Sequence, residues 1–182
     1  EAFDLYCQTF PNSHIASSSP IVVEAQLNGV KFIGINGGPI FKPNPSISFM
    51  AICESKEEID RIWQTFSTDG SILMPLNSYP WSPYYGWIAD KYGVNWQLYQ
   101  GKLSDTNQQA LVPTLMYCGL QQGKCEAALR FYEELFKDFH SNGILRYSEG
   151  DYEGSIQHTQ FLVNGFTLMA MDSGIAQNFT FN

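Results

Sequence analysis

The sequence predicts an α+β fold assembled from repeated βαβββ modules, and three observations lead to this prediction. The chain repeats itself, with matching blocks in the same order in its first and last parts. In the middle of the chain, a helical spacing of apolar residues follows an apolar strand. Asn-Gly pairs at residues 28–29 and 164–165 indicate tight hairpin turns between strands, because both residue types tolerate a positive φ angle.

The internal repeat predicts the order of elements in each copy. Its matching blocks are residues 2–10 with 128–136, residues 26–32 with 162–168, and residues 35–38 with 171–174. In the first copy we expect a helix over residues 1–10 and strands over residues 21–27 and 30–36. The last copy opens with a strand over residues 111–118 and a helix over residues 125–136. The first copy lacks such an opening strand and starts with the pattern of mid-helix, which predicts that further residues precede it.

The middle of the chain has the pattern of a complete β-α-β-β-β unit. An apolar strand is expected over residues 47–53, and the residues SKEE at positions 55–58 form a capping box that begins a helix. The apolar residues of this helix recur at i, i+3, i+4 and i+7: Ile59, Ile62, Trp63 and Phe66. Three short strands are expected around residues 72–76, 86–89 and 94–99.

Composition and charge exclude several classes of protein. The 182 residues are 44% hydrophobic and 15% aromatic, which is enough to bury a substantial core. The net charge is −8 and the chain has no cluster of Lys and Arg, which argues against nucleic-acid binding. No apolar run is long enough to span a membrane, and no segment resembles a signal peptide. The four cysteines are scattered along the chain, which is more typical of reduced core residues than of a disulfide framework. We therefore expect a cytoplasmic protein with reduced thiols and no membrane partner.

Several segments resemble the PhnB-like branch of the vicinal-oxygen-chelate superfamily, which also contains glyoxalase I, extradiol dioxygenases and bleomycin-resistance proteins. The most specific segment is GWIADKYGVNWQ at residues 86–97, and the resemblance covers nearly the whole chain. The other segments are FPNS (10–13), LNG (27–29), NGGP (36–39), ISF (47–49) and EEIDRIW (57–63). This branch often carries the name 3-demethylubiquinone-9 3-methyltransferase. The residues do not support methyl transfer, because the Gly-rich stretch at 34–38 leads into another strand and not into a helix.

The resemblance implies a curled mixed sheet, the glyoxalase/bleomycin resistance-like cup, in which paired βαβββ modules enclose a small-molecule ligand. On this basis we expect a first module at residues 1–100 that lacks its first strand, a linker at residues 101–110, and the first half of a second module at residues 111–182. Because such modules are often exchanged between chains in the family, the expected assembly is a homodimer, with module exchange as one form of it.

Metal-dependent members of the superfamily hold a divalent ion with His and Glu side chains, and this sequence departs from that pattern. Gln97 occupies the position where the resemblance places a metal-binding Glu, and the strand at residues 46–50 contains no His. The three histidines, His14, His140 and His158, do not have metal-ligand spacing. We therefore expect no bound metal and no other cofactor.

Five residues are candidates for contact with a ligand in the cup: Gln97, Tyr99, Glu24, Asn36 and Ser48. Gln97 can exchange hydrogen bonds with a ligand, or it can be a buried amide satisfied by neighbouring strands. Tyr99 shares its strand face with Gln97 and is expected to line the cup. Trp96 faces the other way, and it is expected in the core together with Trp87.

The remaining candidates each have two interpretations. Glu24 lies in an apolar strand and is either an inward general base or a solvent-facing carboxylate. The repeat places Gln160 at the equivalent position, so a carboxylate is not required there. Asn36 either reaches the mouth of the cup or caps a turn, and Ser48 lies on the strand that opens the middle unit.

Two classes of function follow from these residues. The first is a protein that binds a small hydrophobic or aromatic molecule in its cup without a metal. The second is a metal-dependent lyase, isomerase or dioxygenase that acts on a small substrate with vicinal oxygens. The poor set of metal ligands favours the first class. The sequence leaves open whether any reaction is catalysed, and it identifies no catalytic residue.

Overall fold

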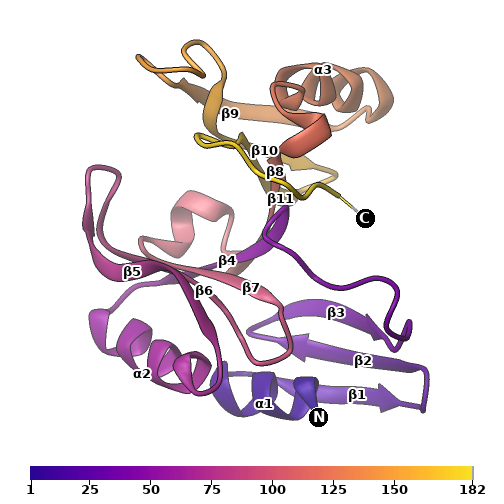
Figure 1. Ribbon diagram of the computed structural model, residues 1–182. Coiled ribbons are helices and arrows are strands. Elements are labelled where there is room, and N and C mark those ends of the chain that lie inside the picture. The colour runs from indigo at the N-terminus through magenta and orange to yellow at the C-terminus, as the bar shows by residue number, and fades with distance from the viewer. Residues whose placement is uncertain (182) are drawn as a thin grey trace. The chain divides into compact units, whose positions relative to one another are not determined.

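The computed structural model describes residues 1–181, which form two compact units (Figure 1). Unit 1 contains Glu1–Pro43 and Met50–Leu111, and unit 2 contains Asn44–Phe49 together with the chain from Val112 onward. Each unit combines helices with strands that are mostly antiparallel. The predicted α+β class is therefore confirmed.

Unit 1 contains two α-helices, each followed by three strands of its own. In chain order they are α1 (Ala2–Thr9), β1 (His14–Ser18), β2 (Val22–Leu27), β3 (Val30–Ile35), α2 (Lys56–Ser67), β5 (Ser71–Tyr79), β6 (Ser82–Ala89), β7 (Asn95–Gln100) and the 3-10 turn η1 (Leu103–Thr106). The strand β4 (Ile47–Cys53) is divided, and Met50 to Cys53 belong to this unit. Residues 101–110, expected as a linker, contain η1 and bond to β4 at both ends, because Gly101 N–H donates to Cys53 and Ile52 N–H donates to Ala110.

The helix α2 begins and packs as the sequence predicts. The Ser55 hydroxyl accepts a hydrogen bond from the Glu58 N–H at 3.2 Å, which satisfies one of the free N–H groups of the first turn. Ile59, Ile62 and Phe66 are buried along one side of the helix. This apolar side contacts β5, β6 and β7, which are hydrogen-bonded with β4 in the order β5-β6-β7-β4. The middle unit therefore has the expected β-α-β-β-β order, here β4-α2-β5-β6-β7.

The first copy of the repeat forms a separate antiparallel sheet in the order β1-β2-β3, with α1 on one face. A Cβ at Gly34 in β3 would overlap the ring of Phe3, so the absence of a side chain lets α1 lie close to the sheet. The sequence patterns do not predict β1, because its five residues are all exposed and mostly polar. Strand pairing to β2, and not burial, forms this strand.

Both Asn-Gly hairpins are confirmed. Asn28 and Gly29 have φ angles of 45° and 81° between β2 and β3. Asn164 and Gly165 have φ angles of 50° and 76° between β10 (Ile156–Val163) and β11 (Phe166–Asp172). The same two-residue turn with two positive φ angles therefore closes the equivalent hairpin in each copy.

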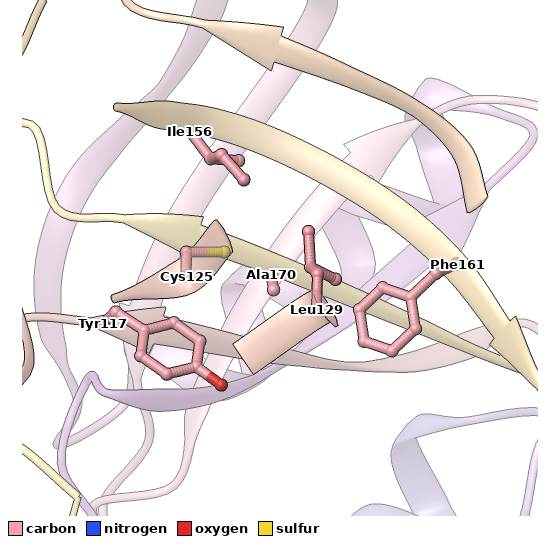
Figure 2. Packing of buried hydrophobic residues seen from close by; sticks show 6 residues of the cluster. All are labelled: Tyr117, Cys125, Leu129, Ile156, Phe161 and Ala170. Atoms are coloured by element: carbon pink, nitrogen blue, oxygen red, sulfur yellow. The ribbon is translucent and has the colours of Figure 1, made fainter. Parts of the chain in front are cut away.

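Unit 2 repeats the β-α-β-β-β order of elements. The first residues of β4 belong to this unit. The elements that follow in it are β8 (Leu111–Tyr117), the 3-10 turn η2 (Gly119–Gln121), α3 (Cys125–Leu135), β9 (Phe139–Arg146), β10 and β11. The strand β11 pairs in parallel with β8 and antiparallel with β10, which pairs antiparallel with β9. Figure 2 shows the core between α3 and these strands, formed by Tyr117, Cys125, Leu129, Ile156, Phe161 and Ala170.

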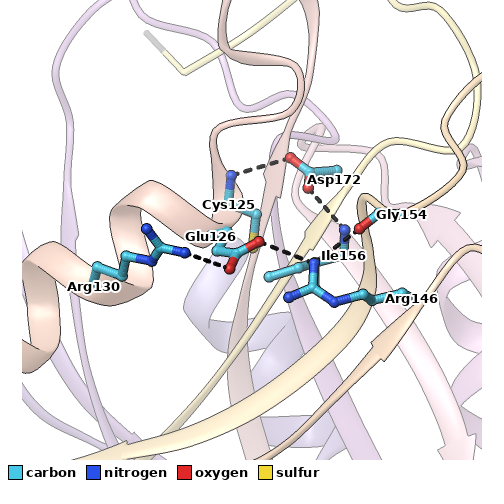
Figure 3. A network of polar contacts seen from close by, with 7 residues as sticks. All are labelled: Cys125, Glu126, Arg130, Arg146, Gly154, Ile156 and Asp172. Atoms are coloured by element: carbon cyan, nitrogen blue, oxygen red, sulfur yellow. Dashed lines mark hydrogen bonds and ion pairs between the residues drawn. The ribbon is translucent and has the colours of Figure 1, made fainter.

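A buried carboxylate joins the start of α3 to the end of β11. Asp172 accepts hydrogen bonds at 3.1 Å from the N–H groups of Cys125 and Ile156, and it is 1% exposed (Figure 3). The same figure shows Glu126, a partly exposed residue that contacts Arg130 at 2.9 Å and Arg146 at 3.0 Å. A negative charge at a helix N-terminus is favourable, since free N–H groups point towards it.

These two acidic residues predict a contrast in stability. Asp172→Ala is expected to lower the free energy of unfolding by about 2–4 kcal/mol, because two buried N–H groups lose their acceptor. Glu126→Ala is expected to leave stability almost unchanged, because solvent screens its exposed ion pairs. Urea unfolding followed by circular dichroism measures both variants. Equal losses would show that Asp172 has no special role in holding α3.

Candidate functional site

One face of the β6–β7 pair carries the polar and aromatic side chains of the candidate site. The antiparallel register places Tyr85 opposite Tyr99 and Trp87 opposite Gln97. Because side chains alternate along a strand and facing residues share a side, these four residues lie on one face. Asn95 belongs to the same face, since it precedes Gln97 by two residues.

The other face of β7 packs against the helices of unit 1. Trp96 is 1% exposed, and its ring stacks on Phe66 of α2 with centroids 5.2 Å apart. Gly86 of β6 lies directly against the Trp63 side chain of α2, where a Cβ would come within 2.6 Å of the Trp63 ring. The two faces of the pair therefore have different roles, with the helix side forming the core and the Gln97 side carrying the candidate site.

A buried hydrogen bond links the two strands at the centre of the site. The Tyr85 hydroxyl donates to Oε1 of Gln97 at 2.7 Å, and both side chains are buried. Burial raises the pKa of Tyr85, so the phenol keeps its proton and acts as the donor. The bond fixes the orientation of the amide, because Oε1 has to face the phenol.

Aromatic rings extend the site from Tyr85 towards the β5–β6 turn. Tyr79 and Trp81 are stacked with centroids 5.1 Å apart, and both pack edge-on against Tyr85, at 5.7 and 5.9 Å respectively. The Tyr99 hydroxyl donates to the Trp81 carbonyl at 3.4 Å. Trp81 is 46% exposed, so this cluster runs from a buried ring to the surface.

Two buried polar atoms on this face have no hydrogen-bond partner within residues 1–181. They are Nε1 of Trp87, a donor, and Oδ1 of Asn95, an acceptor. The other side-chain atom of Asn95, Nδ2, donates to the Gly93 carbonyl at 3.0 Å, which holds the amide in this orientation. Most buried polar groups in proteins are paired, so two such atoms on one face indicate a place where a ligand or water can bind.

The side chains of this face lack the carboxylate and imidazole groups that usually bind divalent metal ions. The strands β5, β6 and β7 contain no Asp, Glu, Lys, Arg or His. The Gln97 amide is neutral, and its Oε1 already accepts the Tyr85 hydroxyl. Within the part of the chain that the structure describes, no group of three or more His, Cys, Asp or Glu is placed to hold a metal ion.

The other sequence candidates lie elsewhere. Glu24 is in β2, partly exposed, with its carboxylate 3.5 Å from the Lys31 ammonium on the same outer face of the three-stranded sheet. Asn36 is exposed after β3, and its N–H donates to the Ile21 carbonyl at 2.7 Å. Ser48 is buried in the part of β4 that belongs to unit 2. Of the five candidates, Gln97 and Tyr99 are the two that unit 1 brings onto the β6–β7 face.

The three histidines do not gather in one place. His14 is exposed in β1, and His140 contacts the Asp138 carboxylate at 2.9 Å on the surface. His158 lies in β10, where burial lowers its pKa below the usual value, so its ring is neutral at pH 7. In the part of the chain that the structure describes, its ring has no hydrogen bond.

Three residues of the site, Tyr85, Trp87 and Asn95, are absent from the sequence candidates. Trp87 was expected in the core, and it is indeed 8% exposed, but it faces the same side as Gln97. The signal that could have found these residues is the register of the β6–β7 hairpin. A pairing centred on the turn at residues 90–94 places Ala89 opposite Asn95, and therefore Trp87 opposite Gln97.

The family model described as 3-demethylubiquinone-9 3-methyltransferase matches residues 1–99 and 109–182. A search of the curated proteins found no match. Among solved structures, the PhnB protein of Bacillus cereus, which bears the same methyltransferase description, is 38% identical; the match covers 54% of this chain and 87% of that chain, with a TM-score of 0.50.

Glyoxalase I from Zea mays shares the fold over a longer stretch. The structure of that enzyme is 13% identical with a TM-score of 0.57, over 96% of this chain and 63% of that chain. A structure of one of its point mutants is 15% identical with a TM-score of 0.60, over 97% and 64% respectively. These identities establish likeness of fold alone. No helix in residues 1–181 has the length and apolar character needed to cross a membrane.

Proposed function

This chain belongs to the 3-demethylubiquinone-9 3-methyltransferase family, the PhnB-like members of the glyoxalase superfamily, and from this membership we propose that it binds a small, neutral, planar molecule on the β6–β7 face of unit 1. The proposal places no metal in this site and no methyl transfer. Its main support is the pair of buried, unpartnered atoms beside the Gln97–Tyr85 hydrogen bond.

The polar atoms indicate which groups such a ligand carries. Trp87 Nε1 requires an acceptor, and Asn95 Oδ1 requires a donor. The two residues are diagonal neighbours on adjacent strands, which places their Cα atoms roughly 7–8 Å apart. A ligand with a carbonyl or hydroxyl near a second hydroxyl or N–H group satisfies both. Leaving both atoms unpaired costs free energy, so pairing them favours binding.

The remaining side chains indicate the shape and charge of the ligand. Tyr79, Trp81 and Tyr85 offer aromatic surfaces, against which planar rings pack well. The three strands β5, β6 and β7 carry no charged residue, so an ionised ligand would lose hydration without gaining an ion pair. These features favour a neutral aromatic or enolic compound.

The test is a titration of the purified protein with catechol, whose neighbouring hydroxyls both donate and accept hydrogen bonds, followed by tryptophan fluorescence. We expect saturable binding that Trp87→Phe weakens roughly tenfold, because the smaller phenyl ring stays aromatic and apolar while the indole N–H is lost. Gln97→Leu is expected to weaken binding by a similar factor. Gln64→Leu, an exposed residue on α2, serves as the matched control and should not change the affinity.

Two further measurements separate binding from folding. Trp87→Phe should keep the parent circular dichroism spectrum and lose only the modest stability expected of a smaller buried ring, because Nε1 has no partner to lose within the described chain. Benzoate, an anion of similar size, should bind much more weakly than catechol. Unchanged catechol affinity in both Trp87→Phe and Gln97→Leu would refute the proposed site.

The assembly is a separate proposal. From the sequence and its resemblance to the family we propose two modules, at residues 1–100 and 111–182, with a linker at residues 101–110. We also propose a homodimer and a cytoplasmic location. Native mass spectrometry of the purified protein tests the assembly. A mass of two chains is expected, and a strictly monomeric species at micromolar concentration would contradict it.

A further inference from the structure

Three of the chain's five methionines lie on one face of unit 2. Met116 of β8 is the direct partner of Met171 in the parallel β8–β11 pair, and Met169 precedes Met171 by two residues. The residues that alternate with them, Leu115 and Ala170, pack in the core around α3. The three thioether side chains therefore share the face that turns away from α3.

A histidine completes a row with two of these methionines. The printed pairs of the antiparallel β10–β11 ladder end at Thr159 opposite Ala170, and continuing the same register by one residue places His158 opposite Met171. Thr159 is on the α3 side with Ala170, which places His158 on the methionine side. His158, Met171 and Met116 thus lie side by side on three adjacent strands, and their Cα atoms span roughly 10 Å.

The environment of this row is suited to a metal ligand set. The His158 ring forms no hydrogen bond or ion pair with any described residue, so no protein group occupies its nitrogens. Met116 is 5% exposed and Met169 is 4% exposed, whereas His158 and Met171 are only partly buried. The row therefore has an apolar, closed end at Met116 and an accessible end at His158.

We propose that His158, Met171 and Met116 bind a soft monovalent cation, with Cu(I) as the ion of this class, and that Met169 supplies a fourth ligand. Thioether sulfur is a soft ligand that selects Cu(I), and a neutral imidazole complements it. No carboxylate belongs to this row, so a divalent ion would lose its hydration shell without compensating negative charge. The ligands are neutral, which suits a cation with a single charge.

The alternative is that the methionines only fill space in the interior, as flexible side chains do. Packing alone predicts no cation affinity and no effect of replacing His158. A cation site predicts that a histidine on one strand and methionines on two others respond together to the same ion. The two interpretations therefore differ in a measurable way.

The experiment uses the chain labelled with ¹³C at the methionine methyl groups and titrated with Cu(I) without oxygen. The methyl signals of Met116, Met169 and Met171 are expected to shift together at one equivalent of copper. The signals of Met50 and Met74, which lie in unit 1, should stay in place. A Cys7→Ser variant, titrated in parallel, removes the only cysteine that is not buried as an alternative thiol ligand within the described chain.

Affinity is measured by competition with the Cu(I) chelator bathocuproine disulfonate. His158→Gln and Met171→Leu should each weaken Cu(I) binding at least tenfold, while Met74→Leu should have no effect. Leucine nearly conserves the volume of methionine, so Met171→Leu keeps the fold even if His158→Gln disturbs it. Copper uptake that leaves the three methyl signals unmoved, or that Met171→Leu does not weaken, would overturn the proposal.

Discussion

Replacing Asp90 by alanine is expected to lower the free energy of unfolding by about 3–5 kcal/mol, among the largest effects of any single substitution in unit 1. Its buried carboxylate accepts hydrogen bonds from the Tyr6 hydroxyl at 2.7 Å and from Trp96 Nε1 at 2.9 Å. It also accepts the N–H groups of Tyr92 and Val94, at 2.8 and 3.1 Å. Alanine leaves all four donors without this acceptor, and two of them belong to buried side chains.

The position of Asp90 explains why its loss affects more than one turn. Tyr6 is 84 residues away in α1, so its hydrogen bond to Asp90 ties the first helix of unit 1 to the β6–β7 turn. The Tyr6 ring also packs edge-on against Trp96, with centroids 5.2 Å apart. Loss of the carboxylate therefore loosens both α1 and the core below the candidate site.

Urea unfolding monitored by tryptophan fluorescence measures this loss, since Trp96 is directly involved. Asp90→Asn should lose less than Asp90→Ala, because the amide keeps one acceptor oxygen. Asp151→Ala, an exposed residue in the loop after β9, is the matched control and should unfold like the parent protein. If Asp90→Ala were as stable as Asp151→Ala, the buried network would contribute nothing to the fold.

The second large effect is expected from Gly70→Ala, at about 3 kcal/mol of lost stability. A Cβ at this position would overlap the Phe66 carbonyl oxygen and would lie 2.8 Å from the Ala89 carbonyl oxygen. Both neighbours are backbone atoms, at the end of α2 and the end of β6, so neither can move by rotating a side chain. The helix and the strand would have to separate to accommodate one methyl group.

Gly37→Ala is the matched control for this substitution. A Cβ at Gly37 meets no atom within 4 Å, and the residue follows β3 in an exposed segment. Its stability should stay within about 0.5 kcal/mol of the parent protein. The midpoints of thermal unfolding, measured by circular dichroism, compare the two variants. A similar midpoint for both would show that α2 and β6 can separate at little cost.

The segment at residues 90–97 connects stability and the candidate site. Its first residue, Asp90, is a structural acceptor for Tyr6 and Trp96, whereas Gln97 at its other end faces the opposite side of β7. The turn between them is held by the Gly93 N–H, which donates to the Asp90 carbonyl at 2.9 Å. The segment that resembles the family therefore mainly stabilises the fold, and its last residue, Gln97, belongs to the candidate site.

Much of the fold follows from local patterns in the sequence. Helical spacing and a capping serine predict α2, and the two Asn-Gly pairs predict both hairpins. These signals depend on residues close together in the chain, which is why they can be recognised without a structure. The strand β1 has no such signal, since all five of its residues are exposed and its pairing with β2 alone defines it.

The candidate site was only partly predictable for the same reason. Alternation along β7 is local, and it places Gln97 and Tyr99 on one face and Trp96 on the other. Glu24 faces outwards because the neighbouring Ala25 is buried on the α1 side of its sheet, which depends on where α1 packs. Alternation along a strand therefore shows which residues share a face. Which element packs on that face depends on contacts with distant parts of the chain.

Patterns in the sequence are sufficient to predict the α+β class, the repeated order of elements, the family, and Gln97 as a residue of interest. The three-dimensional arrangement is needed to show that Tyr85 bonds to Gln97, that Trp87 and Asn95 present unpaired atoms beside them, and that Asp90 reaches Tyr6. The physical reason is that strand register and side-chain pairing join residues distant in sequence. Such contacts are selected by the packing of the whole unit, and no pattern within a short stretch encodes them.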